Sequence, residues 1–144
     1  MENKTAVADP HMRRLVEARL NGSGFAQSLG VEIEIVSPGN VNVSLAYGDQ
    51  LSDRDGCFHE GVLASTASVA LDLAAGTIVG DNAEFKTAEY KFNNFQPACG
   101  HRLLAKSHII KSGRTLVVAE ADLFSITTSG ERHVATVLAT LITV

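Results

Sequence analysis

The sequence has no tryptophan, only three prolines and only two cysteines among its 144 residues. Because Cys57 and Cys99 stand without an accompanying cluster of metal-ligating residues, we expect neither a zinc site nor a disulfide framework, and a reducing, cytoplasmic setting is the simpler interpretation. Basic residues are scattered and the net charge is −4, so neither a nucleic acid nor an anionic membrane is an expected partner. The first ten residues also lack the apolar segment of a secretion signal.

One stretch dominates the chain, namely residues 56–80, which read GCFHEGVLASTASVALDLAAGTIVG. After the triplet HEG it continues as a run of mostly Ala, Ser, Val and Leu, without proline and with Asp72 as its one charge. This pattern predicts a helix of roughly 20 residues, about 30 Å long, that must be buried on nearly every side. A bilayer span is disfavoured, because an acid at the middle of residues 62–79 would cost roughly 2.5–3.5 kcal/mol.

The other segments predict a single α+β domain over residues 1–144. We expect an amphipathic helix over residues 9–22, with Phe25 tucked beneath the turn that follows it and a frayed segment, residues 1–8, before it. Alternating apolar and polar residues predict strands in six segments: residues 31–36, 41–46, 84–95, 102–111, 114–127 and 133–144. Short turns join the last four, so we expect an antiparallel meander that curls around the apolar helix.

Three motifs, taken in order, resemble those of a known family: GCFHEGVLA at residues 56–64, FQPA at residues 95–98 and GRTL at residues 113–116. They make most of the chain similar to the hotdog-fold acyl-CoA thioesterases, specifically the branch of the phenylacetate-degradation thioesterases. The resemblance implies a long central helix wrapped by a curved antiparallel sheet of five to six strands. It also implies a homodimer or homotetramer with acyl-CoA sites at the subunit interface, and no metal or other cofactor.

The resemblance assigns substrate-binding roles to four residues: His59, Gly61, Asp53 and Thr87. Family members read His-Gly-Gly where this chain has His59-Glu60-Gly61 at the start of the central helix. Asp53 stands at the family's polar position before the histidine, and Thr87 at its hydroxyl position before the Pro-Ala pair. The free N–H groups at the helix start, around Glu60 and Gly61, suit the developing oxyanion of thioester hydrolysis.

The catalytic carboxylate of the family is missing from its usual position. Nine residues after His59 the family carries an acid, and this chain carries Ser68. Glu60 and Asp72 are candidate replacements, because both lie on the same stripe of the helix as Ser68. Each residue also has a structural alternative: pairing of Asp72 with an Arg or Lys across the dimer, stabilisation of the helix dipole by Glu60, and relief of packing by Ser68.

The leading prediction is an acyl-CoA thioesterase in which helix N–H groups polarise the thioester carbonyl and a carboxylate activates water. The alternative is a non-catalytic acyl-CoA-binding protein that has lost the general base, for which Ser68 is the direct evidence. A hydratase of the same fold is less favoured, because residues 62–79 contain no histidine. Cys57 is disfavoured as a nucleophile, since its attack would exchange one thioester for another. Four scattered basic residues could contact the phosphates of CoA, but a sheet face exposed to solvent explains their positions equally well. They are Arg102, Lys106, Lys111 and Arg114.

Overall fold

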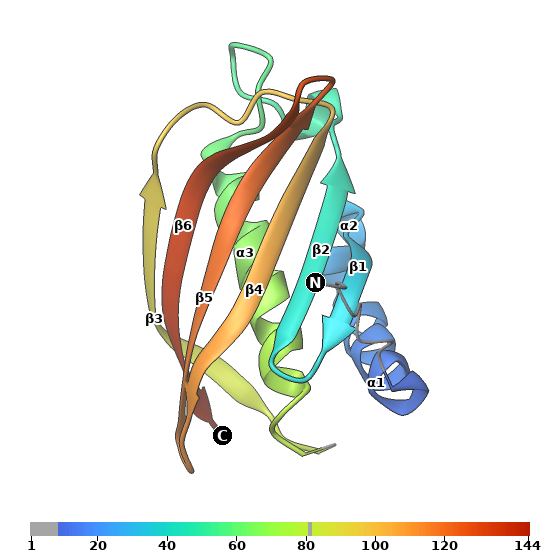
Figure 1. The fold of residues 1–144 in the computed structure, drawn as a ribbon, viewed down its shortest axis with the longest axis vertical. Coiled ribbons are helices and arrows are strands. Elements are labelled where there is room, and N and C mark those ends of the chain that lie inside the picture. The colour runs from blue at the N-terminus through green and yellow to red at the C-terminus, as the bar shows by residue number, and fades with distance from the viewer. Residues whose placement is uncertain (1–8, 81) are drawn as a thin grey trace, which may run out of the picture.

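The fold is an antiparallel sheet with one long helix lying against it (Figure 1). The computed structural model describes residues 9–80 and 82–144, so the expected frayed segment, residues 1–8, lies outside the described residues. In chain order the elements are α1 (Pro10–Asn21), α2 (Gly24–Leu29), β1 (Glu32–Ser37), β2 (Asn40–Ala46), the short 3-10 helix η1 (Asp49–Leu51), α3 (Glu60–Gly76), β3 (Phe85–Asn94), β4 (Arg102–Ser112), β5 (Leu116–Thr127) and β6 (Gly130–Thr143). Among the described residues, none of the helices combines the length and the apolar character that crossing a bilayer requires.

The six strands form one sheet in the order β1-β2-β4-β5-β6-β3, and every neighbouring pair is antiparallel. The α+β class and the six strands are therefore confirmed, but the expected meander is wrong at its first member. β3 does not lie beside β4; it pairs with β6, from Phe85 opposite Thr143 to Asn94 opposite Ala135. The place beside β4 is taken by β2, so the chain crosses the end of the sheet through residues 95–101 (Figure 1).

Two residues explain why the chain leaves the sheet between β3 and β4. Pro97 has no N–H group to donate to a strand ladder, so it ends the pairing. Gly100 then passes so close to the carbonyl oxygen of Ile126 that a Cβ atom there would collide with it. The N–H of His101 donates to that same carbonyl at 3.0 Å, which returns the chain to the sheet at the start of β4.

α3 packs its apolar side onto the inner face of the sheet, as the apolar run predicts. Its largest fully buried side chains are Leu63, Leu71 and Leu73. Small residues on α3 let the sheet approach closely: the Ser107 hydroxyl on β4 lies 2.9 Å from the carbonyl oxygen of Ala70. The helix has 17 residues, somewhat fewer than the roughly 20 expected.

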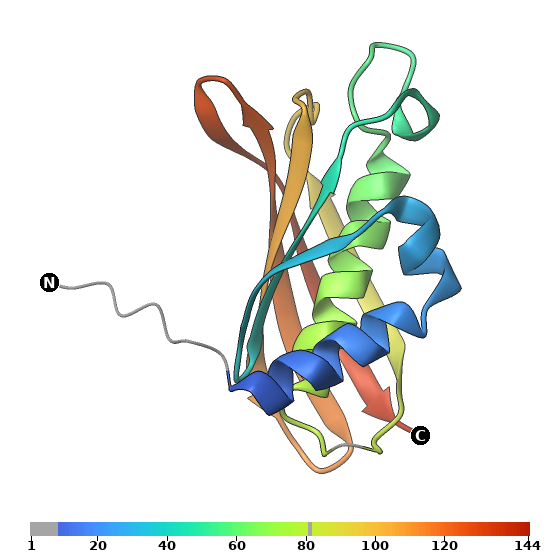
Figure 2. The same ribbon diagram turned by 90° about the vertical axis from the view of Figure 1, so that its right-hand side faces the viewer.

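The expectation that α3 is buried on nearly every side is wrong along one stripe. Glu60, Gly61 and Ser68 are exposed, and Asp72 is half-buried. The reason lies in the cover on the side away from the sheet, where α1 and α2 lie across only part of the helix (Figure 2). An open face of α3 therefore remains between these helices and β3.

The N-terminal segment contains one predicted helix and one that the pattern did not indicate. α1 begins as expected, because the Asp9 carboxylate accepts the N–H of His11 at 3.1 Å. α2 is capped by the Ser23 side chain and ends at Gly30, whose φ of 76° favours glycine. The expected burial of Phe25 is wrong: it is 58% exposed, because α2 turns Ala26 rather than Phe25 toward the core.

Candidate active site

The start of α3 supplies a candidate oxyanion site. His59 caps the helix, and its Nδ1 accepts the N–H of Gly61 at 2.8 Å, so the ring proton lies on Nε2. The N–H of Val62 is also occupied, since it donates to the His59 carbonyl at 2.9 Å. Among the described residues, nothing accepts the N–H of Glu60, the first residue of the helix. Two N–H donors were expected here, those of Glu60 and Gly61. The N–H of Gly61 is occupied by the His59 ring, so the N–H of Glu60 is the one that can donate to the carbonyl oxygen of a substrate.

The loop before α3 is fastened to the connection between β3 and β4. Phe58 forms isolated bridges with both Ser52 and Ala98, and its N–H donates to the Ala98 carbonyl at 3.0 Å. Phe58 is 4% exposed, so the attachment has an apolar centre. The HEG and FQPA motifs, separated in the sequence by most of α3 and by β3, consequently come together at one end of α3.

A disulfide joins Cys57 to Cys99 beside this bridge, with the Cα atoms 4.3 Å apart. The expectation that the two cysteines form no disulfide framework is therefore wrong. The reason is the pairing of Phe58 with Ala98, which brings together two residues separated by 42 positions. Cys57 has no thiolate while it is paired, and this agrees with the view that it is not a nucleophile.

A cavity of about 230 Å³ opens at this end of α3 and unites two of the predicted site residues, Asp53 and Glu60. Its other walls come from the loop, the first turns of α3 and the end of β3: Asp55, Cys57, Phe58, Leu63, Asn94, Phe95, Gln96, Pro97 and Ala98. The Asp53 carboxylate accepts the N–H of Arg54 at 2.7 Å, which gives it a role in shaping the loop. The Glu60 carboxylate has no hydrogen bond or ion pair to any described residue. We call this space the mouth cavity.

The remaining predicted residues lie elsewhere, in a second cavity of about 260 Å³ between α3, α2 and the first half of β3. Ser68, Asp72 and Thr87 all line it. Along the axis of α3, Ser68 is about 12 Å and Asp72 about 18 Å from Glu60 at 1.5 Å per residue. Within one chain, neither side chain can reach a thioester held at the Glu60 N–H. We call this space the inner cavity.

Asp72 is held by a partner that the sequence did not reveal. Its two carboxylate oxygens accept from Nε and Nη2 of Arg19 at 2.8 and 2.9 Å, and this fork is typical of strong ion pairs. The hydrogen bond to Asp72 is the main reason why the pKa of Arg19 is raised above its ordinary value. Arg19 also lies over the ring of Phe85, 4.3 Å from its centre. The pairing expected across a dimer is thus made within the chain, between α1 and α3.

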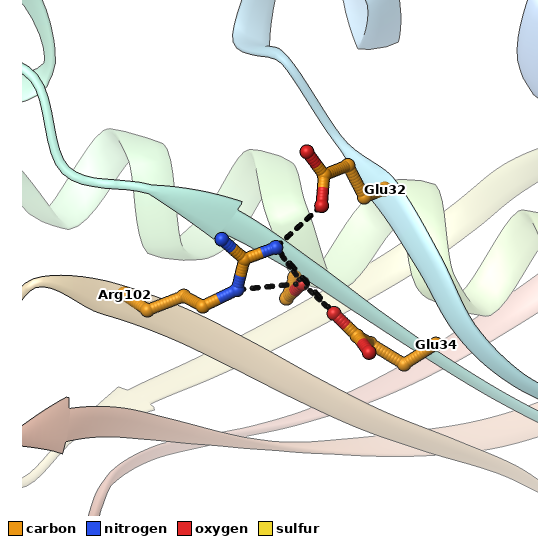
Figure 3. Close-up of polar contacts among 4 residues, drawn as sticks. Glu32, Glu34 and Arg102 are labelled. Atoms are coloured by element: carbon orange, nitrogen blue, oxygen red, sulfur yellow. Dashed lines mark hydrogen bonds and ion pairs between the residues drawn. The ribbon is translucent and has the colours of Figure 1, made fainter.

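Two of the four basic residues that were candidate contacts for CoA phosphates form ion pairs with carboxylates on the outer face of the sheet. Arg102 donates to Glu32 at 2.5 Å and to the Ser44 hydroxyl at 2.8 Å, with Glu34 3.5 Å away (Figure 3). Lys106 similarly pairs with Glu131. These contacts favour the interpretation of a solvated sheet face for Arg102 and Lys106. Of the remaining two, Lys111 lies near the end of β4 and Arg114 lies in the β4–β5 turn, at the end of the sheet opposite the start of α3 (Figure 1).

Sequence reasoning also missed Tyr90 on β3. Its hydroxyl donates to the carbonyl oxygen of Ala64 in α3, and burial raises the pKa of the phenol. Tyr90 packs against the core from the same strand as Phe92, and the identity of its partner depends on how α3 sits against that strand. Arg19 was missed for the same reason, since only the crossing of α1 over α3 brings it to Asp72.

The comparisons with known proteins agree with this architecture. No protein-family model matches the sequence. A thioesterase family protein from Silicibacter pomeroyi has a similar structure, with a TM-score of 0.89 and 29% identity, over 92% of this chain and 98% of that one. The PaaI protein from the phenylacetic acid degradation operon of E. coli shares the fold, with a TM-score of 0.81 and 16% identity over 92% and 93% of the two chains.

A sequence relative points the same way. A protein of Saccharolobus solfataricus named as a candidate esterase is 27% identical over 94 residues, which are 65% of this chain and 66% of the relative. The match therefore spans just under two thirds of the relative's length. Together with the six-stranded sheet around α3, these likenesses show that the chain has the hotdog fold and that its structural neighbours are proteins of the thioesterase superfamily.

Proposed function

We propose that the protein hydrolyses acyl-CoA thioesters to a carboxylic acid and free CoA. The observation that carries the proposal is the pairing of two groups on one residue: the N–H of Glu60 lacks an acceptor among the described residues, and the Glu60 carboxylate lines the same mouth cavity. A helix N-terminus favours negative charge, so the N–H suits an oxygen that becomes an anion during the reaction. The carboxylate suits the activation of water.

The reaction then follows from these two groups. The thioester oxygen accepts the Glu60 N–H, and the carboxylate takes a proton from water as the water oxygen bonds to the carbonyl carbon. The electron pair of the C=O bond moves to the oxygen, where the N–H and the helix dipole stabilise it. When the C=O bond re-forms, the C–S bond breaks, and the CoA thiolate receives the proton that Glu60 had taken. The products are the acid and the CoA thiol, and Glu60 is a carboxylate again.

We also propose that two chains pair through the free edge of β3, which is the last strand of the sheet. The open stripe of α3 lies next to that edge, so a two-fold axis there would set two α3 helices antiparallel. The start of one helix would then face the middle of the other. This arrangement gives Ser68 and Thr87 a place in the site, from the second subunit, that they cannot reach within one chain. Sedimentation at twice the mass of the 15.3 kDa chain is the expected result, and a monomer at assay concentration contradicts it.

A matched pair of substitutions tests the catalytic assignment. Glu60→Gln and Asp72→Asn each remove one carboxylate charge from α3 and keep its shape. We expect Glu60→Gln to lower kcat by roughly 10²–10⁴-fold, the usual contribution of a general base, whereas Asp72→Asn keeps kcat within a few-fold. Thiol release from a panel of acyl-CoAs is the measurement. The opposite pattern would make Asp72 the base.

The second candidate function is acyl-CoA binding without catalysis, and Ser68 at the family's acid position favours it. It predicts that the wild-type protein binds acyl-CoA but releases no thiol above background from any substrate. Binding can be measured by calorimetry on the same preparation. Hydrolysis of any acyl-CoA by the wild type, lost in Glu60→Gln, excludes this alternative.

A further inference from the structure

The disulfide between Cys57 and Cys99 is attached to the wall of the mouth cavity at one of its two ends. Cys57 lines the mouth cavity together with Glu60, whereas Cys99 lines neither this cavity nor the inner cavity. The Sγ atom of Cys57 lies 4.0 Å from the carbonyl oxygen of Asp55, another residue of the same wall. The S–S bond therefore runs from a residue of the cavity wall to a residue outside it.

Cys57 is also close in the chain to the candidate oxyanion site. It precedes Glu60 by three positions, so the Cα atoms of the two residues are at most about 11 Å apart. Both residues line a single space of about 230 Å³. A thioester whose carbonyl oxygen accepts the Glu60 N–H consequently places its sulfur in the cavity that Cys57 helps to form.

The two cysteines differ in their access to solvent. Cys57 is buried, with 5% of its surface exposed, whereas Cys99 is half-buried. Thiol–disulfide exchange depends on which sulfur the attacking thiolate can reach. A small thiol in bulk water therefore meets Cys99 more readily, and a thiol already held in the mouth cavity meets Cys57. The same disulfide thus offers two different targets to free and bound thiols.

We propose that Cys57 is a site of covalent modification by the thiol of free CoA, through thiol–disulfide exchange. This rests on the proposed function, which takes the sulfur that becomes the CoA thiol to lie in the mouth cavity. The CoA thiolate, whose proton has passed to water, attacks Sγ of Cys57, and a new S–S bond forms as the bond to Cys99 breaks. The electron pair of the broken bond goes to Sγ of Cys99, which takes up a proton from water. One disulfide replaces another, so neither an oxidant nor a reductant is consumed.

The exchange acts on the loop that carries the start of α3. In the adduct the covalent link across 42 positions is open, and the bridge between Phe58 and Ala98 beside it loses its fastening. Attack of the Cys99 thiolate on the adduct expels CoA and restores the original bond, so the step is reversible. In this step Cys57 is attacked, so it needs no thiolate of its own. The modified fraction should rise with the concentration of free CoA, which is the product of the proposed hydrolysis.

The test compares two thiols on the wild-type protein at equal concentration. CoA is one, and N-acetylcysteamine, which has the same thiol group without the nucleotide, is the matched control. Iodoacetamide stops the reaction and alkylates the cysteine that exchange has freed, and mass spectrometry of the intact chain and of its peptides locates both groups. We expect CoA to react roughly ten-fold or more faster, because a bound thiol is held beside the bond that it attacks. CoA should be found on Cys57 and the alkyl group on Cys99.

Three controls show whether the folded cavity is responsible. In urea the two thiols should react at equal rates, since only the folded chain holds CoA beside the disulfide. Desulfo-CoA, which lacks the sulfur, should slow the reaction of CoA with the folded protein by occupying the cavity. The double variant Cys57→Ala, Cys99→Ala should gain no mass from either thiol.

The outcomes separate this inference from the proposed hydrolysis. Selective attachment of CoA to Cys57 supports the inference even if the protein releases no thiol from any acyl-CoA, in which case the hydrolysis proposal alone fails. Hydrolysis of acyl-CoA without such attachment overturns the inference and leaves the proposed function standing. Attachment of CoA to Cys99, or equal rates for CoA and N-acetylcysteamine on the folded protein, also overturns it.

Discussion

Removal of the disulfide between Cys57 and Cys99 should destabilise the protein by an amount that follows from its place in the chain. The bond closes a loop of 42 residues, and constraint of the unfolded chain by such a loop is worth about 4 kcal/mol at 25 °C. For a chain of 144 residues, each kcal/mol changes Tm by roughly 3 °C, so the expected loss is about 12 °C. The perturbation is the double substitution of both cysteines by alanine, which leaves no unpaired thiol behind.

Two measurements check this prediction. Wild-type protein purified without reductant and then denatured should show no thiol reactive toward a colorimetric reagent, since its only two cysteines are paired. Thermal unfolding followed by circular dichroism should then show a lower Tm in the alanine variant and in the reduced wild type. Reductant should not change the Tm of the alanine variant, which serves as the control. Two reactive thiols in the unreduced protein would refute the reasoning, and so would an unchanged Tm on reduction.

The disulfide should also matter for the candidate site. It lies beside the bridge between Phe58 and Ala98, which fastens the loop before α3. Amide hydrogen exchange at Phe58 should therefore accelerate on reduction more than exchange in the central strand β5. Equal acceleration at both places would mean that the bond stabilises the fold as a whole and not the loop.

Three further predictions concern stability. Asp72→Asn breaks the partly exposed pair with Arg19 and should cost about 1 kcal/mol at low salt and less at high salt, measured by urea unfolding. Burial raises the pKa of Tyr90, so the folded chain keeps a proton that the unfolded chain releases near pH 10. The free energy of unfolding should therefore fall above pH 10, by up to about 1.4 kcal/mol per pH unit. Tyr90→Phe should remove this dependence on pH. Ser125→Ala should be neutral or stabilising, because its buried hydroxyl has no hydrogen-bond partner among the described residues. Ser107→Ala should instead cost about 1 kcal/mol, since the Ser107 hydroxyl lies 2.6 Å from one buried carbonyl and 2.9 Å from another; thermal unfolding compares the two variants.

Periodicity in the sequence was sufficient for the elements and insufficient for their order in space. The alternating segments became strands, and the apolar run became α3, because both patterns reflect which side of an element is buried. The position of β3 next to β6 did not follow from them. Short connections favour adjacent strands, and only the crossing through residues 95–101, with Pro97 and Gly100, overrides that tendency.

The candidate site divides in the same way. The sequence by itself determined which groups stand at the start of α3, because His59, Glu60 and Gly61 are consecutive and a helix start fixes their geometry locally. Only the tertiary structure decided which distant groups meet. It paired Asp72 with Arg19, placed Tyr90 against Ala64 and joined Cys57 to Cys99. The physical reason is that local patterns report the burial of a residue, whereas its partner depends on how whole elements cross, and that is set by the packing of the entire core.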